Sequence, residues 1–153
     1  MKNIITDIGE EVRNISHQMM PRALQELGLV AAVEDMLEKS LHPSPIKYKF
    51  EHFGLTKRLA EDVEIAIYRI SQELINNIIK HSEAEMVGVQ LIRRKDFLFL
   101  VVEDNGKGVA KGKAKGDGIG MLTIQNRLNI INGELEFNSA EGEGTSATIR
   151  VRL

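Results

Sequence analysis

The sequence predicts an α+β fold, a two-layer α/β sandwich in which helices cover one face of a mixed sheet, preceded by an N-terminal helical segment. Segments with apolar residues at every third or fourth position are interleaved with shorter segments in which apolar residues alternate with polar ones. They do not follow the regular strand–helix repeat of a doubly wound sheet. The chain of 153 residues is long enough for one compact domain and an extra element at one end.

The first forty residues predict helix with one interruption. Residues 4–20 carry an apolar stripe that Pro21 breaks, and the stripe resumes until Pro43 and Pro45. Because a single amphipathic helix needs a partner to bury its stripe, we interpret this segment as the tail of a helical hairpin whose first half lies outside the sequence. The stripe consists of Ile5, Ile8, Val12, Ile15 and Met19, then Leu24, Leu27, Val30, Ala31, Val33 and Leu37.

Four elements are predicted in the first part of the sandwich. Residues 46–52 alternate between apolar and charged side chains, which indicates a half-buried strand. Residues 59–80 have the apolar spacing of a long helix. Residues 87–92 alternate again, and the continuous apolar run over residues 97–102 indicates a central strand.

The remaining chain predicts a loop, a helix and two strands. Residues 105–118 are rich in Gly and Lys, which indicates a loop, and residues 119–131 return to helical spacing. A short strand is predicted over residues 135–137. Residues 145–153 alternate strictly and predict a last strand with one buried face.

The composition excludes several kinds of site. The absence of cysteine excludes disulfides, zinc–thiolate sites and thiol nucleophiles. The net charge is −2 with both signs mixed along the chain, which argues against direct binding of nucleic acid through a basic surface. No apolar run approaches the roughly 20 residues of a membrane helix, and the N-terminus lacks the apolar core of a signal peptide. We therefore expect a cytoplasmic location, either free or as the cytoplasmic part of a membrane-bound protein.

The long helix contains the first group of chemical interest. Asn77 follows Glu73 by four residues, and Lys80 and His81 follow Asn77 by three and four, so an α-helix would place them on one face. A carboxylate, an amide oxygen and a cation on successive turns suit a site for Mg²⁺ and a triphosphate. A solvated polar helix face explains the same spacing, and the spacing alone does not decide between them.

A second group follows the central strand. Asp104 ends an apolar run and is followed by Gly106 and Gly108. A carboxylate at a strand end can accept a hydrogen bond from an exocyclic amine such as that of adenine. An ordinary Asp-Asn-Gly turn is the simpler alternative.

The third group comprises two glycine motifs. Gly116, Gly118 and Gly120 lead into the helix over residues 119–131, where backbone N–H groups and the helix dipole favour an anion. Gly144 and Thr145 open the last strand, for which a simple hairpin is sufficient explanation. Each motif alone is weak evidence for a phosphate site.

Taken in order, these four motifs resemble those of the GHKL ATPase superfamily, which includes gyrase, heat-shock chaperones, mismatch-repair ATPases and histidine kinases. The resemblance covers about residues 46–153 and implies the Bergerat ATP-binding fold, with ATP and Mg²⁺ as ligands. It implies that Asn77 binds Mg²⁺ and that Glu73, the catalytic residue, orients the attacking group near the γ-phosphate. Lys80 and His81 would approach the phosphates.

The resemblance also implies roles for the other motifs. Asp104 would accept the adenine amine, together with a water held by Thr145. Gly106 and Gly108 would let the backbone pass beneath the base. Gly118 and Gly120 would let a lid close over the triphosphate. Lys111, Lys113 and Lys115 of the loop are either solvated or help to neutralise the triphosphate.

Residues 13–33, with the core Pro21-x-x-Leu24-x-x-Leu27-Gly28-Leu29, are similar to the second dimerisation helix of nitrate-sensor-type histidine kinases. We therefore predict a partial dimerisation and phosphotransfer helix with a linker over residues 1–42, and the ATP-binding catalytic domain over residues 43–153. The acceptor motif of this subfamily, a His followed by Asp or Glu, is absent. His17 precedes Gln18 and lies where the second helix of the hairpin is expected, so the acceptor histidine should lie outside this sequence.

The resemblance implies a two-component protein histidine kinase that forms a homodimer at full length. Its partner would be a response regulator with receiver and helix-turn-helix domains. Two alternatives stay open: a serine protein kinase of the anti-sigma type, and a non-catalytic nucleotide-binding module. The first should lack the Pro21–Leu29 string, and the second should lack an intact Glu73, Asn77 and Asp104.

Overall fold

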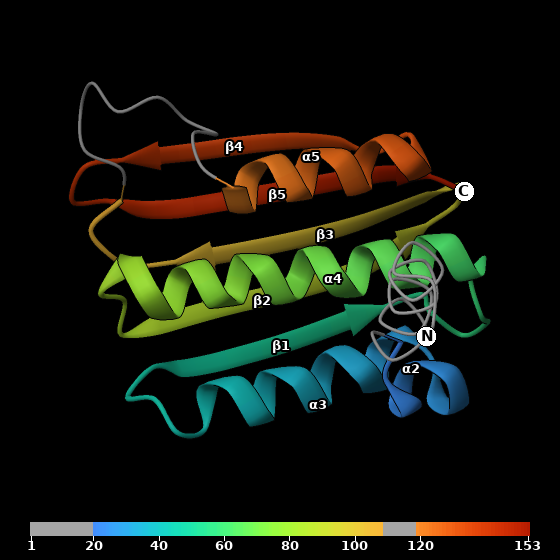
Figure 1. The fold of residues 1–153 in the computed structure, drawn as a ribbon, viewed down its shortest axis with the longest axis horizontal. Coiled ribbons are helices and arrows are strands. Elements are labelled where there is room, and N and C mark those ends of the chain that lie inside the picture. Colours follow the sequence, from blue (N-terminus) through green and yellow to red (C-terminus); the bar gives the residue numbers. More distant parts are fainter. Residues whose placement is uncertain (1–19, 109–118) are drawn as a thin grey trace, which may run out of the picture.

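The computed structural model describes residues 20–108 and 119–153, apart from the side chain of Ile119. Helices and a five-stranded sheet form two layers (Figure 1). The elements in chain order are α2 (Arg22–Leu27), α3 (Leu29–Leu41), β1 (Lys47–Phe53), α4 (Glu61–Asn77), the π-helical turn η1 (Ile78–Ser82), β2 (Met86–Arg94), β3 (Phe97–Asp104), α5 (Ile119–Ile131), β4 (Glu134–Ala140) and β5 (Gly144–Arg152).

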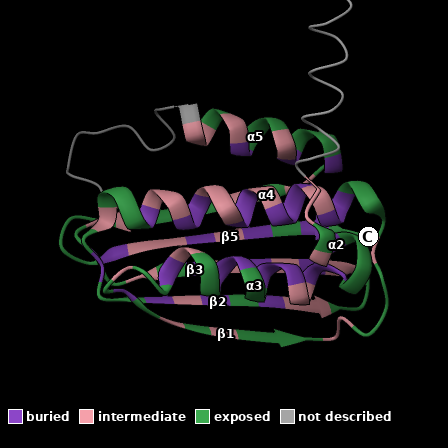
Figure 2. Ribbon diagram, turned by 60° about the horizontal axis from the view of Figure 1, so that its bottom comes forward, coloured by how far each residue is buried: buried purple, intermediate pink, exposed green. Residues whose placement is uncertain are grey.

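The sheet is mixed, as predicted. The strand order is β1-β2-β3-β5-β4, and β1 and β2 run parallel while the other neighbours run antiparallel. Along β2, β3 and β5 every second residue is buried under the helix layer. In Figure 2 the buried parts of α3 and α4 lie toward the sheet. The predicted two-layer α/β sandwich is therefore confirmed.

Most predicted elements are confirmed with small changes at their ends. The helix over residues 119–131 agrees with α5, and the last strand is β5, shifted by one residue. The short strand predicted over residues 135–137 is longer, because β4 pairs with β5 along its whole length. The long helix predicted over residues 59–80 is a shorter α-helix, since it begins at Glu61 and widens into η1 after Asn77.

The second part of the N-terminal helical segment is broken at Gly28. Gly28 has φ +91°, so the chain forms two helices, α2 and α3, in place of one. The predicted stripe is wrong at Leu27, which is 70% exposed because the break turns it away from the core. The part of the stripe before residue 20, and His17, lie outside the described residues.

One hydrophobic core joins both layers. Its buried side chains come from α2 and α3 as well as from α4, α5 and the central strands. Leu24, Val33 and Leu37 are completely buried in it. The division into residues 1–42 and 43–153 stays a prediction, and the core extends across it. None of the helices within the described residues is long and apolar enough to span a membrane.

Candidate functional site

The predicted site residues gather at one end of the sandwich. There α4 and η1 end, β3 ends, and α5 and β5 begin, on the left of Figure 1. The sheet topology explains why they gather there. Because β3 and β5 are antiparallel, the last residue of β3, Asp104, pairs with Thr145 at the beginning of β5. Elements that are far apart in sequence therefore place their motifs side by side.

Glu73 and Asn77 lie on the last two turns of α4 and meet the beginning of α5. Both residues are half-buried. A Cβ atom built on Gly120 would collide with Oε1 of Glu73 and would lie 3.4 Å from Nδ2 of Asn77. Only glycine leaves room for this carboxylate and amide in their present positions. The structure thus brings together three of the predicted residues, from two helices.

Lys80 and His81 lie on η1, the turn that follows Asn77. Each residue of a π-helix turns the chain by less than in an α-helix, so Lys80, three residues after Asn77, is rotated away from the Asn77 face, whereas His81, four residues after it, stays close to that face. Both side chains are exposed. Among the described residues, neither forms a hydrogen bond or ion pair with Glu73 or Asn77. The apolar spacing does not indicate the π-helical turn, a feature that is frequent at functional sites.

Asp104 is the last residue of β3 and is half-buried. Its Oδ1 accepts a hydrogen bond from the Gly106 N–H at 2.8 Å, and the Thr145 backbone N–H also donates to the carboxylate. Burial raises the pKa of Asp104, and these two hydrogen bonds oppose that rise. Within the described part of the chain it forms no ion pair. Such a carboxylate can accept a hydrogen bond from one further N–H donor.

The turn after Asp104 is packed tightly against neighbouring backbone. A Cβ on Gly106 would collide with the carbonyl oxygen of Ser82, which accepts a hydrogen bond from the Lys107 N–H at 2.7 Å. Gly108 has φ +68°, and a Cβ there would collide with the Ala140 carbonyl oxygen. These glycines therefore allow close backbone approach between the turn, η1 and the β4–β5 hairpin.

Asn105 was missed by the sequence reasoning. Its Oδ1 accepts hydrogen bonds from the backbone N–H groups of Glu85 and Met86, both at 2.9 Å. This side chain attaches the Asp104 turn to the beginning of β2. An Asn that follows a strand-ending Asp is a common turn residue, and nothing in the spacing indicated which backbone it would cap.

The Thr145 side chain points to another partner. Its Oγ1 lies 2.8 Å from Oγ of Ser139 on β4. The backbone of Thr145, and not its hydroxyl, reaches the Asp104 carboxylate. The predicted role of the hydroxyl in holding a water stays a prediction. Gly118 and the three loop lysines lie outside the described residues.

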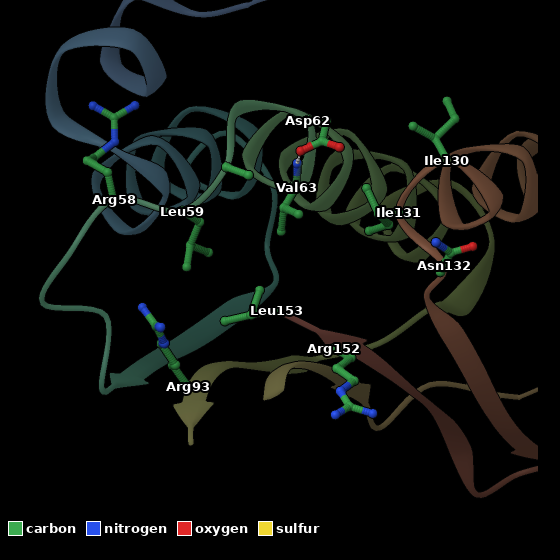
Figure 3. A pocket seen from close by; sticks show the side chains of 11 residues that line it. Arg58, Leu59, Asp62, Val63, Arg93, Ile130, Ile131, Asn132, Arg152 and Leu153 are labelled. Carbon is green, nitrogen blue, oxygen red and sulfur yellow. Dashed lines mark hydrogen bonds between the residues drawn. The ribbon is translucent and has the colours of Figure 1, made fainter. Parts of the chain in front are cut away.

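A separate pocket of about 380 Å³ lies at the opposite end of the sandwich (Figure 3). The beginning of α4 and the ends of α5, β2 and β5 surround it. None of the predicted site residues lines it. Its lining residues are Arg58, Leu59, Ala60, Asp62, Val63, Arg93, Ile130, Ile131, Asn132, Arg152 and Leu153.

Comparison with known proteins gives consistent results. Residues 62–153 match the family described as "Histidine kinase-, DNA gyrase B-, and HSP90-like ATPase". The chain is 35% identical over 139 residues to the signal transduction histidine-protein kinase/phosphatase DegS of Bacillus subtilis, covering 87% of this chain and 36% of that protein. It is 27% identical over 154 residues to the oxygen sensor histidine kinase NreB of Staphylococcus carnosus, covering 100% of this chain and 44% of that protein. The chain thus spans less than half the length of these relatives.

Solved structures share the fold. The blue-light activated histidine kinase of Erythrobacter litoralis EL346 superposes with a TM-score of 0.67 at 20% identity, covering 82% of this chain and 41% of that chain. The Acinetobacter baumannii histidine kinase AdeS superposes with a TM-score of 0.65 at 16% identity, covering 99% of this chain and 86% of that chain.

Proposed function

Since the chain belongs to the family of histidine kinase-, DNA gyrase B- and HSP90-like ATPases, we propose that it is the ATP-binding catalytic part of a two-component sensor histidine kinase. In this proposal it transfers the γ-phosphoryl group of ATP to a histidine outside this sequence, and the group passes on to a response regulator. The histidine kinases among its relatives support this choice within the family. The observation that carries the proposal is the meeting of Glu73, Asn77 and Gly120 between α4 and α5.

The phosphate end of the site would be formed by α4, η1 and the beginning of α5. Asn77 would hold Mg²⁺ through its amide oxygen, a hard ligand that this cation accepts. When bound, Mg²⁺ neutralises charge on the phosphate oxygens. The donor set fits, because Glu73 and Asn77 lie one turn apart on α4, both half-buried, and Gly120 has no side chain that would displace them. Lys80 and His81, exposed on η1, would approach the phosphates from the solvent side.

The base would bind at the end of β3. Asp104 would accept the exocyclic amine of adenine, since its carboxylate is desolvated and has only backbone donors among the described residues. Gly106 and Gly108 would let the base lie close to the backbone, and Thr145 would support this region from β5. Gly118 and Gly120 would allow the preceding loop to cover the triphosphate.

Glu73 would act on the attacking group. In the transfer, a P–N bond to the acceptor imidazole forms while the P–O bond to the leaving ADP breaks. Glu73 would orient that imidazole by accepting a hydrogen bond from its ring N–H. Catalysis would rest on positioning and on neutralising charge more than on covalent chemistry by the protein.

The wider assignments are part of the same proposal. We expect a homodimer at full length, a response regulator with receiver and helix-turn-helix domains as partner, and a cytoplasmic location. The residues of the Pro21–Leu29 string and the DegS and NreB relatives support the pairing with two-component signalling.

The decisive experiment is calorimetry with a non-hydrolysable ATP analogue, with and without Mg²⁺. The parent chain should bind more tightly with Mg²⁺, and Asn77→Ala should lose that difference. Asn76→Ala is the matched control, because Asn76 is the neighbouring half-buried asparagine and has no role in the proposed site. Absence of binding at millimolar nucleotide, or equal loss in both variants, would refute the assignment. Phosphate transfer to a separate helical hairpin that carries the acceptor histidine tests the kinase step itself.

A further inference from the structure

Arg58, which precedes α4, connects two parts of the molecule that the sequence separates. Its Nε and Nη2 donate to the carboxylate of Glu64 on α4, at 3.1 Å and 2.7 Å to the nearer oxygens. Its Nη1 donates to the carbonyl oxygen of Gln25 at 3.0 Å, and Nη2 also donates to that of Leu24 at 2.9 Å. Figure 3 shows the guanidinium directed toward the ribbon of α2.

Glu64 is the anchor of this connection. It is 2% exposed, which is unusual for a glutamate. Its carboxylate receives the two-pronged contact from Arg58 and a weaker hydrogen bond from the Leu59 N–H at 3.4 Å. A buried charge is tolerated only when it is paired and hydrogen-bonded, so Glu64 fixes the position of the Arg58 head group.

The carbonyl groups that Arg58 contacts belong to the end of α2. Carbonyls in the last turn of a helix are incompletely paired within the helix and carry the negative end of its dipole. The Leu24 carbonyl oxygen accepts the Gly28 N–H at 3.3 Å, and Arg58 is a second donor to it. A guanidinium can donate to these carbonyls and to a carboxylate at the same time, because its five N–H groups form a planar fork. The start of α4 and the end of α2 are thereby joined through one side chain.

We call the contacts of Arg58 with Glu64 and with the α2 carbonyls the joint, and Gly28 makes room for it. Its backbone has φ +91° and ψ −176°, a conformation essentially restricted to glycine. A Cβ at this position would lie 3.2 Å from Cδ of Arg58. Gly28, for which the ATP site offers no explanation, is therefore required between α2 and α3 by its backbone conformation and by the path of the Arg58 side chain.

We propose that Arg58 is a positioning residue, which with Glu64 and the Gly28 corner fixes the direction in which the N-terminal helical segment leaves the ATPase sandwich. The inference rests on the proposed function. α4 carries Glu64 near its beginning and Glu73 and Asn77 at its end. Glu64 and Glu73 are about 14 Å apart along the helix axis. The Arg58 contacts thus fix the N-terminal segment relative to α4, the helix that holds the phosphate end of the site. They would thereby set the position of an acceptor attached to that segment relative to the bound ATP.

The test measures this direction separately from nucleotide binding. The native chain has no cysteine, so Arg22→Cys on α2 and Gln90→Cys on β2, both exposed, provide a unique pair of spin-label sites. The parent should give one narrow inter-label distance distribution. Arg58→Gln should broaden or shift it, Arg58→Lys should restore it in part, and the dissociation constant of an ATP analogue should stay within about twofold because the sites are far apart.

Two further variants keep the test decisive. Arg58→Gln leaves Glu64 buried without its partner, so the double variant Arg58→Gln/Glu64→Gln removes both charges and should show the same broadened distance while folded. Arg93→Gln is the matched control, since Arg93 lies at the same end of the sandwich and does not contact α2 through a hydrogen bond. Unchanged distances in the folded double variant, or the same broadening in Arg93→Gln, would overturn the inference. Absence of ATP binding in the parent would refute the proposed function. The inter-label distances would still show whether Arg58 fixes the direction of the N-terminal segment.

Discussion

Gly120→Ala tests the contact on which the proposed phosphate site depends. The added Cβ would collide with Oε1 of Glu73 and touch Nδ2 of Asn77. An ordinary contact between a carbon and an oxygen atom needs about 3.5 Å, so the carboxylate has to move by roughly 1 Å. A displacement of that size in a positioning group can lower a rate by about 100-fold, which corresponds to about 2.7 kcal/mol in the activation free energy.

The fold should survive this change. Gly120 is the second residue of α5, and alanine is more favourable than glycine in a helix by up to about 1 kcal/mol. We therefore expect an unfolding midpoint at or above that of the parent, together with a large loss of phosphoryl transfer. This combination separates a site effect from a stability effect.

The assay follows transfer of phosphate from ATP to a separate hairpin that bears the acceptor histidine, alongside urea unfolding of the same preparations. Gly88→Ala is the control, because no atom lies within 4 Å of a Cβ added there. Its transfer rate should equal that of the parent. A Gly120→Ala protein that transfers phosphate within about twofold of the parent would show that the position of Glu73 does not limit the reaction.

Three further predictions concern Asp104 and the core. Asp104→Asn removes a charged acceptor, so the preference for ATP over GTP in calorimetry should fall by roughly 10- to 150-fold; an unchanged preference would contradict the adenine assignment. Burial raises the pKa of Asp104, so its contribution to stability is most favourable below the unfolded pKa of about 3.9 and is lost as the pH rises through the folded pKa. The free energy of unfolding, measured with urea, should therefore gain more or lose less between pH 3 and pH 7 in Asp104→Asn than in the parent. Parallel plots of unfolding free energy against pH would contradict this. Leu98 is completely buried, so Leu98→Ala should cost about 2–5 kcal/mol of unfolding free energy, whereas the exposed Leu27→Ala should change it by less than about 0.5 kcal/mol.

The spacing of apolar residues predicted helices and strands well where a single element buries one of its own faces. The strictly alternating residues of β5 and the helical spacing of α5 gave nearly correct bounds, because each buries one face against the same core. Gly28 belongs to the Pro21–Leu29 string, yet its effect as a helix break depends on a positive φ that composition does not reveal. The change from α4 to η1 was also hidden, since both helix types are compatible with the same apolar spacing.

The candidate site shows the same limit. Motif order was sufficient to predict that Glu73, Asn77 and Gly120 belong together, and the structure brings them into contact. The side chains that connect the elements to one another, at the site and at the opposite end of the sandwich, were not predictable, because their partners are backbone groups far away in sequence. Asn105 caps the beginning of β2, and Arg58 contacts carbonyls 33 and 34 residues earlier in the chain. Such contacts depend on the assembled fold and leave no periodic signal.

The single core that runs from α2 to β5 limits how the protein can be divided. A shortened version that begins at residue 43 would lose the apolar side chains of α2 and α3, each worth about 1.5–3 kcal/mol when fully buried. Their total is of the order of the entire net stability of a domain, about 5–15 kcal/mol. The facing surfaces of α4 and β1 would then be open to water and to other copies. Residues 21–42 are therefore part of the smallest unit that can be transplanted, and an exchange with a related chain should be joined ahead of Pro21. Leu24, Leu29, Ala32, Val33, Met36, Leu37 and Leu41 would all be removed by the shorter cut.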